Sequence, residues 1–360
     1  MRVLQIGADR LKRGILYPGT PACKRQEAYA KAFGTLDIVG FSLKSDGAKF
    51  IDVSHLHIHP TNSSSRFLYV LNAIRIARKL PKPDVVSVQD PFEAGIAGWL
   101  IARMRKVPLH VQVHTDFLSP EYVALSFTNR VRGWVAGFVL RRATRIRVVS
   151  ERVREAIENH YHLEIPITVL PIFAEVERLK FSLPDELLAE RFRSFSSRVL
   201  VVARLEPEKD VATAIRLFAG YAPVSACLII VGEGSERENL ENFVVERHLE
   251  HRVFFEGTAD PERYYKTADL LLATSKYEGY GLVIAEALAA GTPVISTDVG
   301  AARELGAIVG SSFEELGEKI VEWFQHGARE AHLHAYPYKN FDEYVRSYCS
   351  DIAACPVHTK

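Results

Sequence analysis

Short apolar runs alternate with amphipathic segments along the whole chain. Before Pro171 the apolar runs predict strands at 2–7, 37–42, 84–89, 109–114, 145–150 and 167–171, separated by helical patterns at about 24–34, 65–80, 92–106, 120–143 and 151–160. After Pro171 the alternation restarts, with strands at 198–205, 226–232, 252–257, 270–274 and 293–297 and helices near 208–220, 235–247, 261–267, 281–290 and 313–326. Apolar strands that alternate with helices indicate parallel sheets covered by helices on each side.

This pattern predicts an α/β protein of two Rossmann-like, doubly wound domains. We place the N-terminal domain at 1–175 and the C-terminal domain at 176–335, and we expect 336–360 to form a terminal helix that crosses back to the N-terminal domain. A length of 360 residues suits two domains of this size. Ligands of open α/β sheets bind at the carboxyl ends of the strands, so two such domains facing each other would enclose a binding cleft.

Charge is distributed unevenly between the two halves. Residues 1–175 contain 25 Lys and Arg against 15 Asp and Glu, whereas the remainder contains 20 against 29, although the net charge is only +1. The basic half either faces an anionic partner, such as membrane lipid, a phosphorylated substrate or nucleic acid, or simply differs in surface charge. Four cysteines without a CxxC pair, and a start without the long apolar segment of a signal peptide, favour the reducing cytoplasm.

The most informative stretch is SKYEGYGLVIAEALAAGTPVI, residues 275–295. The glycines beside Tyr280 let the backbone approach a ligand closely, and the helix that begins near Gly281 presents free N–H groups to a phosphate. Glu278 can reach a group bound at this helix start, and Glu286 can accept hydrogen bonds from paired hydroxyls such as a ribose diol. The alternative is an ordinary acid at a helix start and a solvated charge.

Two further pieces follow strands of the same half. In VVARLEPEKD, residues 201–210, Arg204 ends a strand and Lys209 precedes a helix. These two cations can clamp a diphosphate, unless they are an ordinary surface pair. The segment IIVGEGSERENL, residues 229–240, reads as a strand, a glycine turn and a helix, which by itself is common in parallel sheets.

Together these pieces resemble glycosyltransferase family 4, whose members have the two-domain GT-B fold. The resemblance covers nearly all of residues 198–310 and rests on RLEPEK, VGEGSERENL, FEG, two glutamates eight positions apart, and AGTPVISTDVG. It implies that Arg204 and Lys209 bind the donor diphosphate, and that Glu278 contacts the donor sugar as a catalytic residue while Glu286 holds the ribose. The implied backbone contacts to sugar and phosphates are those of Gly279, Tyr280, Gly281 and Leu282.

In the N-terminal half, the candidate residues follow two consecutive strands. Asp90 follows one strand, and His114 and Asp116 end the next. A His-x-Asp at a strand end resembles the family pattern in which the histidine faces the donor sugar, which would make His114 catalytic; otherwise His114 caps the next helix. Gly19 stands alone where family members often carry a Gly-Gly loop, which leaves that loop's contacts open. Gly19, Asp90 and Asp116 are the candidates on the acceptor side.

The segment 129–147 predicts an amphipathic helix with two open orientations. Val131, Trp134, Val135, Phe138 and Val139 form an apolar stripe beside several arginines, and small residues lie roughly opposite. Packing the small face on the sheet would leave the stripe free for a peripheral membrane contact, whereas the reverse orientation would bury it. The basic half of the chain supports the membrane contact, and many enzymes that resemble this one act on lipid-linked acceptors.

The resemblance implies a retaining hexosyltransferase that uses a UDP- or GDP-linked sugar and a lipid, saccharide or small-molecule acceptor. The chain has no D-x-D motif, and we expect no metal, no cofactor besides the nucleotide sugar as co-substrate, and no nucleic-acid partner. The expected location is the cytoplasm, at the inner face of the membrane if the stripe is exposed. Two alternatives stay open: a nucleotide-sugar hydrolase or epimerase on the same fold, and a non-catalytic subunit that binds nucleotide sugar.

Overall fold

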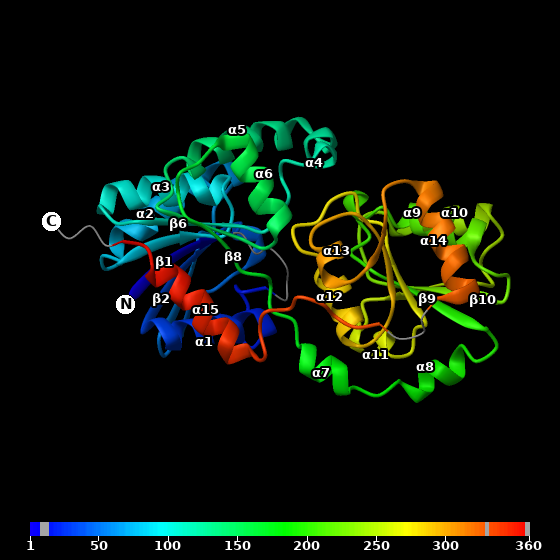
Figure 1. Ribbon diagram of the computed structural model, residues 1–360. Coiled ribbons are helices and arrows are strands. Elements are labelled where there is room, and N and C mark those ends of the chain that lie inside the picture. Colours follow the sequence, from blue (N-terminus) through cyan, green and yellow to red (C-terminus); the bar gives the residue numbers. More distant parts are fainter. Residues whose placement is uncertain (8–13, 328–330, 357–360) are drawn as a thin grey trace. The chain divides into compact units, whose positions relative to one another are not determined.

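The structure, a computed structural model, describes residues 1–7, 14–327 and 331–356 (Figure 1). The chain divides into two compact units, one of Met1–Leu170 with Asp342–Lys360 and one of Pro171–Phe341. These limits lie a few residues from the expected 175/176 and 335/336. The reason is local, because the Tyr336 hydroxyl accepts a hydrogen bond from the Ala174 N–H at 2.6 Å and the Tyr338 hydroxyl donates to the Pro171 carbonyl at 3.3 Å.

The first unit is built on a sheet with the strand order β3-β4-β2-β1-β5-β6-β7-β8, in which only β3 runs antiparallel to its neighbour. The strands of its described residues are β1 Arg2–Gly7, β2 Thr35–Gly40, β3 Ile51–Val53, β4 Leu56–Pro60, β5 Val85–Val88, β6 Leu109–Val113, β7 Arg145–Val148 and β8 Ile167–Val169. The helices are α1 Pro21–Phe33, α2 Tyr69–Lys79, α3 Glu93–Arg105, α4 Pro120–Leu125, α5 Phe127–Leu140, α6 Glu151–Tyr161 and α15 Phe341–Ala353.

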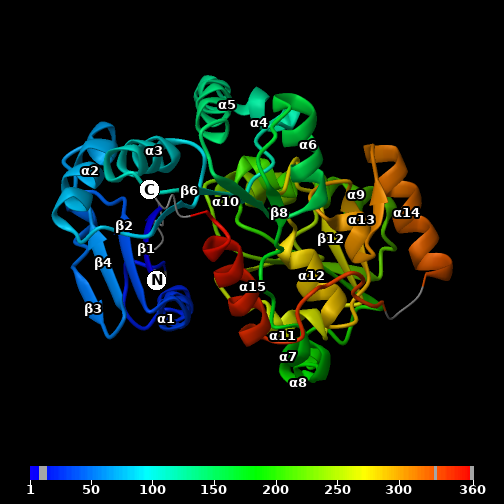
Figure 2. The same cartoon turned by 60° about the vertical axis from the view of Figure 1, so that its left-hand side comes forward.

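Helices cover both faces of this sheet, with α1 and α15 on one face and α2, α3 and α5 on the other (Figure 2). Buried polar contacts hold α15 in place. Asp351 of α15 accepts hydrogen bonds from His110 at 3.0 Å and from Arg145 at 2.5 Å, and the Tyr348 hydroxyl accepts one from Gln112 at 2.9 Å. The last helix of the chain is therefore part of the first unit.

The prediction of one continuous helix at 120–143 is wrong, because the chain forms two helices there, α4 and α5. Ser126 between them is extended, with φ −162° and ψ 155°, and its hydroxyl accepts a hydrogen bond from the Asn129 N–H at 3.1 Å. A serine in this position is a strong helix N-cap, so α5 starts anew at Phe127.

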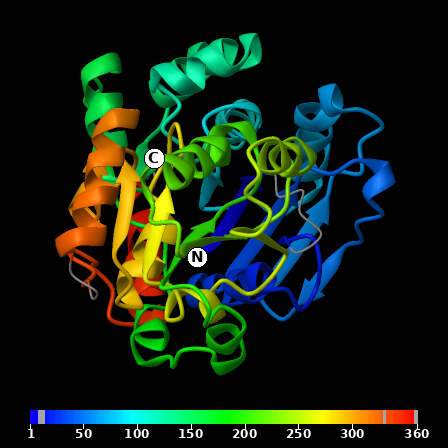
Figure 3. The same ribbon diagram turned by 90° about the vertical axis from the view of Figure 1, so that its right-hand side faces the viewer.

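The second unit is built on a wholly parallel sheet with the order β11-β10-β9-β12-β13-β14 (Figure 3). Its described strands are β9 Ser197–Val202, β10 Ala226–Val231, β11 Val253–Gly257, β12 Leu270–Ala273, β13 Val294–Thr297 and β14 Ile308–Gly310. The helices are α7 Val176–Phe181, α8 Glu186–Arg191, α9 Val211–Tyr221, α10 Arg237–Glu246, α11 Glu262–Tyr265, α12 Leu282–Ala289, α13 Ala302–Leu305 and α14 Phe313–His326.

The core of the second unit lies between its sheet and the helices α9, α10 and α14. Leu228, Ile230, Phe218, Leu240 and Trp323 are among its fully or almost fully buried members. Within the part of the chain that the structure describes, no helix is both long enough and apolar enough to cross a bilayer.

Candidate functional site

The candidate donor site lies where the strand order of the second sheet reverses. The chain proceeds from β9 outward through β10 and β11, then returns to β12 on the other side of β9. The loops after β9 and β12 therefore diverge at the carboxyl edge, and such a reversal is where open α/β sheets bind ligands. The loop after β9 carries Arg204 and Lys209, and the loop after β12 carries Glu278.

Lys209 and Glu278 meet across this reversal. The Lys209 ammonium donates to Glu278 Oε1 at 2.5 Å, and the Ser275 hydroxyl donates to the same oxygen at 2.8 Å. Both charged side chains are largely buried, with exposed fractions of 17% for Lys209 and 22% for Glu278. The strand reversal thus brings one cation and one carboxylate into contact, with Ser275 as a second donor to the carboxylate.

Arg204 takes a different partner. Its guanidinium donates to Glu208 Oε1 at 2.7 Å, four residues along the chain, and 60% of the side chain is exposed. Each of the two cations thus pairs with a carboxylate of its own. An exposed pair of this kind stabilises the fold by at most about 1 kcal/mol, so Arg204 can exchange Glu208 for an anionic ligand at little cost.

The glycine turn after β10 supports the loop that carries Arg204. A Cβ on Gly232 would lie 1.8 Å from the Ala203 carbonyl oxygen, and one on Gly234 would lie 2.2 Å from that of Leu205. The Leu205 N–H donates to the Glu233 carbonyl at 2.9 Å. The glycines of VGEG therefore allow the two loops to pack closely, and this packing holds the Arg204 loop in place.

The first turn of α12 presents backbone N–H groups at the same edge. Gly281 precedes the helix with φ +96°, and no side chain caps the helix start. Gly300 holds this loop, since the N–H of the next residue, Ala301, donates to the Tyr280 carbonyl at 2.8 Å and a Cβ on Gly300 would lie 2.5 Å from that oxygen. A helix start with open N–H groups and a partial positive charge is suited to phosphate.

Glu286 lies further along α12 and faces α11. Its carboxylate accepts a hydrogen bond from the Tyr265 hydroxyl at 2.7 Å. Burial raises the pKa of Glu286 to about 7; the Tyr265 hydrogen bond opposes this shift, and the nearby acids Glu262 and Asp260 add to it. The carboxylate is therefore short of hydrogen-bond donors, which a vicinal diol would supply.

In the first unit, His114 and Asp90 follow the neighbouring strands β6 and β5. Burial lowers the pKa of His114 to about 3, with Arg147 and His110 adding to the shift, so its imidazole is neutral at physiological pH. Asp90 accepts a hydrogen bond from the Phe92 N–H at 2.8 Å just before α3, and burial raises its pKa to about 6. Asp90 thus has a local structural role in the turn before α3.

Asp116 and Gly19 occupy turns beside this edge. Burial raises the pKa of Asp116, while Arg152 and backbone N–H groups oppose the shift. Gly19 has φ +78° and is followed by Thr20, whose hydroxyl caps α1 through the Cys23 N–H at 3.1 Å. A positive φ is the reason for a glycine at this position. The loop directly after β1, residues 8–13, lies outside the described residues.

Helix α5 exposes only part of its apolar stripe. Trp134 is 84% exposed, Phe127 77% and Val131 45%, whereas Val139 is fully buried against Gly95. The small residues Ala136 and Gly137 are buried. Neither predicted orientation holds over the whole helix, because Val139 packs against Gly95 and Gly137 against Tyr161, whereas Val131 and Trp134 at the beginning of the stripe are exposed.

The sequence did not predict the side chains that form hydrogen bonds with these candidate residues. Tyr265, Ser275 and Glu208 are the side chains that bind Glu286, Glu278 and Arg204. The carboxylate of Asp269 and the side chain of Arg198 form another such pair at the opposite edge of the sheet. Within the described residues, no group of three His, Cys, Asp or Glu side chains is arranged to hold a metal ion.

Two family models match the chain. The model described as Glycosyltransferase Family 4 matches residues 29–178, and the one described as Glycosyl transferases group 1 matches residues 190–310. The chain is 28% identical over 251 residues to alpha-monoglucosyldiacylglycerol synthase of Streptococcus pneumoniae, covering 64% of this chain and 56% of that protein. It is 29% identical over 250 residues to 2-deoxystreptamine glucosyltransferase of Streptomyces kanamyceticus, covering 63% and 62%. The chain therefore spans less than two thirds of the length of these relatives.

Two solved structures have a similar fold over almost the whole chain. HepE from Anabaena, in complex with UDP and glucose, aligns with a TM-score of 0.70 at 20% identity and covers 98% of this chain and 95% of that one. Sucrose-phosphate synthase from Thermosynechococcus elongatus aligns with a TM-score of 0.73 at 17% identity, with the same coverage. At such identities the likeness shows a common fold of two Rossmann-like domains.

Proposed function

The chain belongs to glycosyltransferase family 4 and has the GT-B fold, and from this premise we propose that it transfers a hexose from a nucleotide diphosphate sugar to an acceptor, with retention of the anomeric configuration. The observation that carries the proposal is the chemistry at the strand reversal of the second sheet. There the Lys209–Glu278 pair lies beside the uncapped start of α12, and Glu286 follows on the same helix.

Each part of a nucleotide sugar has a suitable group in this region. We assign the diphosphate to Lys209, Arg204 and the N–H groups of α12, because cations and a helix start favour phosphate. Glu286 takes the ribose diol, since its buried carboxylate accepts one side-chain hydrogen bond from the described residues, that of Tyr265. Glu278 takes the hydroxyls of the donor sugar, once the diphosphate has drawn Lys209 away.

The reaction needs charge stabilisation more than a strong base. Cleavage of the bond between the anomeric carbon and the phosphate oxygen leaves negative charge on the diphosphate, which the cations and the helix start offset. No general base is assigned for the acceptor hydroxyl, so the leaving phosphate oxygen is the proposed proton acceptor. The imidazole of His114 in the first unit is neutral, which suits a hydrogen bond to a hydroxyl rather than an interaction with a charge.

UDP-glucose is the first donor to test. A structural relative binds UDP and glucose, and the curated relatives are named for glucosyl transfer to diacylglycerol and to 2-deoxystreptamine. These acceptors differ widely, so we infer the acceptor class of this chain from the residues exposed on its own surface. The exposed residues Val131 and Trp134, within a half of the chain that carries excess Lys and Arg, favour a peripheral membrane contact through 129–147 and a lipid-linked acceptor, and the exposed Phe127 just before this segment adds to the apolar surface.

The donor assignment is tested by thermal stabilisation with UDP, GDP and ADP and then with their sugar conjugates. A ligand at 100 times its dissociation constant stabilises the protein by about 2.7 kcal/mol, which is a clear shift in melting temperature. Lys209→Ala should abolish this shift, whereas Lys276→Ala, an exposed lysine of the β12 loop, should retain it. Equal shifts in both variants would contradict the assignment, and nucleotide release without any acceptor would indicate a hydrolase.

The membrane contact is tested by sedimentation with vesicles that contain phosphatidylglycerol. Replacing Phe127 and Trp134 by serine should reduce the fraction of protein bound to the vesicles, because apolar area favours the interface. Added salt should also reduce the bound fraction, because basic charge favours an anionic interface. Val224→Ser, which changes an equally exposed residue of the second unit, serves as the control. Failure of the unaltered protein to bind vesicles would remove the membrane contact and leave the donor assignment intact.

A further inference from the structure

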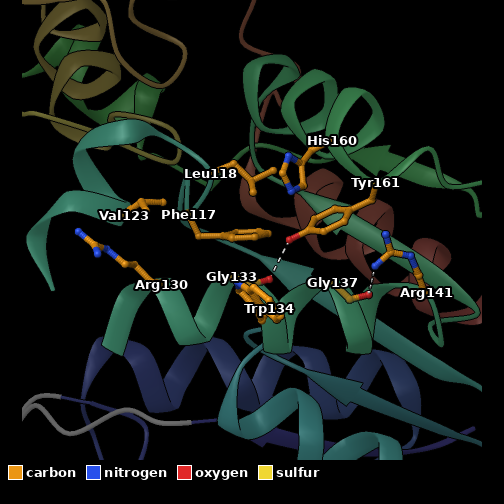
Figure 4. A pocket seen from close by; sticks show the side chains of 10 residues that line it. All are labelled: Phe117, Leu118, Val123, Arg130, Gly133, Trp134, Gly137, Arg141, His160 and Tyr161. Atoms are coloured by element: carbon orange, nitrogen blue, oxygen red, sulfur yellow. Dashed lines mark hydrogen bonds between the residues drawn. The ribbon is translucent and has the colours of Figure 1, made fainter. Parts of the chain in front are cut away.

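A groove runs along α5 in the first unit, between this helix, α6 and the segment before α4 (Figure 4). Its volume is about 520 Å³, within the range of roughly 300–1,000 Å³ that is usual for small-molecule sites. The residues that line it are Phe117, Leu118, Val123, Arg130, Gly133, Trp134, Gly137, Arg141, His160 and Tyr161. None of them belongs to the donor site.

The middle of the groove is aromatic and apolar. Gly133 and Gly137 have no side chains, so Tyr161 lies directly against the helix and its hydroxyl donates to the Gly133 carbonyl at 2.9 Å. The ring of Phe117 stacks near that of Tyr161, with 6.5 Å between centroids, and the exposed Trp134 forms the rim. With the Tyr161 hydroxyl already bonded, this stretch offers few polar groups to a ligand and favours a hydrocarbon chain.

Both ends of the groove carry positive side chains. Arg141 donates to the Gly137 carbonyl at 3.1 Å and its guanidinium carbon lies 5.1 Å from the centroid of the Tyr161 ring, so it is held in place with other N–H groups still available. His160 lies next to Leu118, with the Tyr161 ring between it and Arg141, and Arg130 lies at the other end of the groove (Figure 4). The lining contains no acidic residue, which makes the groove complementary to an anion.

We propose that this groove binds one anionic phospholipid of the membrane, with the lipid phosphate at Arg141 and one hydrocarbon chain along Tyr161, Phe117 and Trp134. The chain would extend toward the start of α5, where Phe127 is exposed. The inference rests on the proposed membrane contact and deepens it, because it assigns a specific lipid class to a specific site. A sugar is a poorer fit, since it needs polar partners along its whole length and the middle of the groove lacks them.

Gly133 allows the groove to be filled without harm to the fold. A Cβ built on Gly133 meets no heavy atom within 4 Å, so its side chain would point into open space in the groove. Gly133→Leu should therefore fold normally and occupy the site of the lipid chain. Gly220→Leu is the matched control, because Gly220 is also helical and a Cβ there also meets no heavy atom within 4 Å, but it lies in the second unit.

The binding assay uses dihexanoyl phosphatidylglycerol below its micelle concentration, so that one lipid molecule is measured without a membrane. The fluorescence of Trp134 at the groove rim reports binding. We expect saturable binding at one lipid per chain, at least tenfold weaker in Gly133→Leu and in Arg141→Gln, and unchanged in Gly220→Leu. Dihexanoyl phosphatidylcholine should bind more weakly, because it adds a positive group beside Arg141.

Three results would overturn the proposal. Unchanged lipid affinity in Gly133→Leu would place the lipid elsewhere, and inorganic phosphate binding as tightly as the lipid would reduce the groove to an anion site. Loss of self-association in Gly133→Leu, seen by sedimentation, would assign the groove to a second copy of the chain. Nucleotide-induced stabilisation and vesicle sedimentation, measured on the same variants, separate each of these results from a failure of the proposed function.

Discussion

The buried carboxylate of Glu286 makes a quantitative prediction about stability. Burial raises its pKa from an ordinary 4.5 to about 7 in the folded chain. Below its pKa in the unfolded chain, the carboxyl group is protonated in both the folded and the unfolded state, so its titration does not change the free energy of unfolding. As the pH rises toward the folded pKa the unfolded state releases its proton first, so folding loses free energy. At about 1.4 kcal/mol per pKa unit, the total loss by neutral pH is about 3 kcal/mol.

Glu286→Gln removes this titration and keeps an oxygen that can accept from the Tyr265 hydroxyl. The variant should have nearly the same free energy of unfolding as the unaltered protein near pH 4.5, and it should be more stable by up to about 3 kcal/mol near pH 8. The difference should develop between the unfolded and the folded pKa of Glu286. Trp323 is buried in the core of the second unit and the other tryptophans, Trp99 and Trp134, precede that unit. Urea unfolding followed by fluorescence, with these two replaced by phenylalanine, therefore reports on the relevant unit.

Glu246→Gln, an exposed glutamate on α10, is the control and should show no such dependence. A stability difference between Glu286→Gln and the unaltered protein that stays constant from acid to neutral pH would refute the reasoning. The same carboxylate links to ligand binding, because donors from a ribose diol favour its charged form. Nucleotide binding should therefore release a proton near pH 6.5, measurable by calorimetry in two buffers, and this release should vanish in Glu286→Gln.

Two further predictions concern close packing and buried charge. Gly232→Ala should destabilise the second unit by roughly 3 kcal/mol or more in urea unfolding, because its Cβ would overlap the Ala203 carbonyl, whereas Gly220→Ala should stabilise it by about 0.5–1 kcal/mol; equal effects would contradict the packing argument. Asp351→Ala should destabilise the first unit by about 3–5 kcal/mol, since the buried His110 and the partly buried Arg145 lose their partner. Asp342→Ala on the same helix should change stability by about 1 kcal/mol or less. An Asp351 variant of near-normal stability would show that the contacts do not hold α15.

Periodicity predicted the sheets of both units well, because parallel strands buried on both faces read as unbroken apolar runs. The apolar runs missed β3 and β14, which have three residues each, and β4, Leu56–Pro60, in which histidines alternate with the apolar residues. The break at Ser126 was readable in principle, since serine is a common N-cap, but the apolar spacing continues across it. Local capping chemistry decided the structure there against the longer periodic pattern.

The orientation of α5 could not be decided from its own sequence. A wheel with large apolar residues on one side and small ones on the other allows either side to face the protein. The choice depends on partners distant in the chain: Tyr161 packs on Gly137, and Val139 packs on Gly95. Once these contacts are made, the helix rotation is set, and Trp134 and Phe127 are left in solvent.

The candidate donor residues show the same dependence on topology. The motifs identified Lys209 and Glu278 as members of separate pieces, but their contact follows only from β9 and β12 being neighbours in the sheet. The two residues are 69 positions apart, and the intervening chain builds β10 and β11 on the far side of β9. The strand reversal therefore brings the residues of two weak local patterns together as one charged pair. For this physical reason, the order of the motifs along the chain was more informative than any one of them.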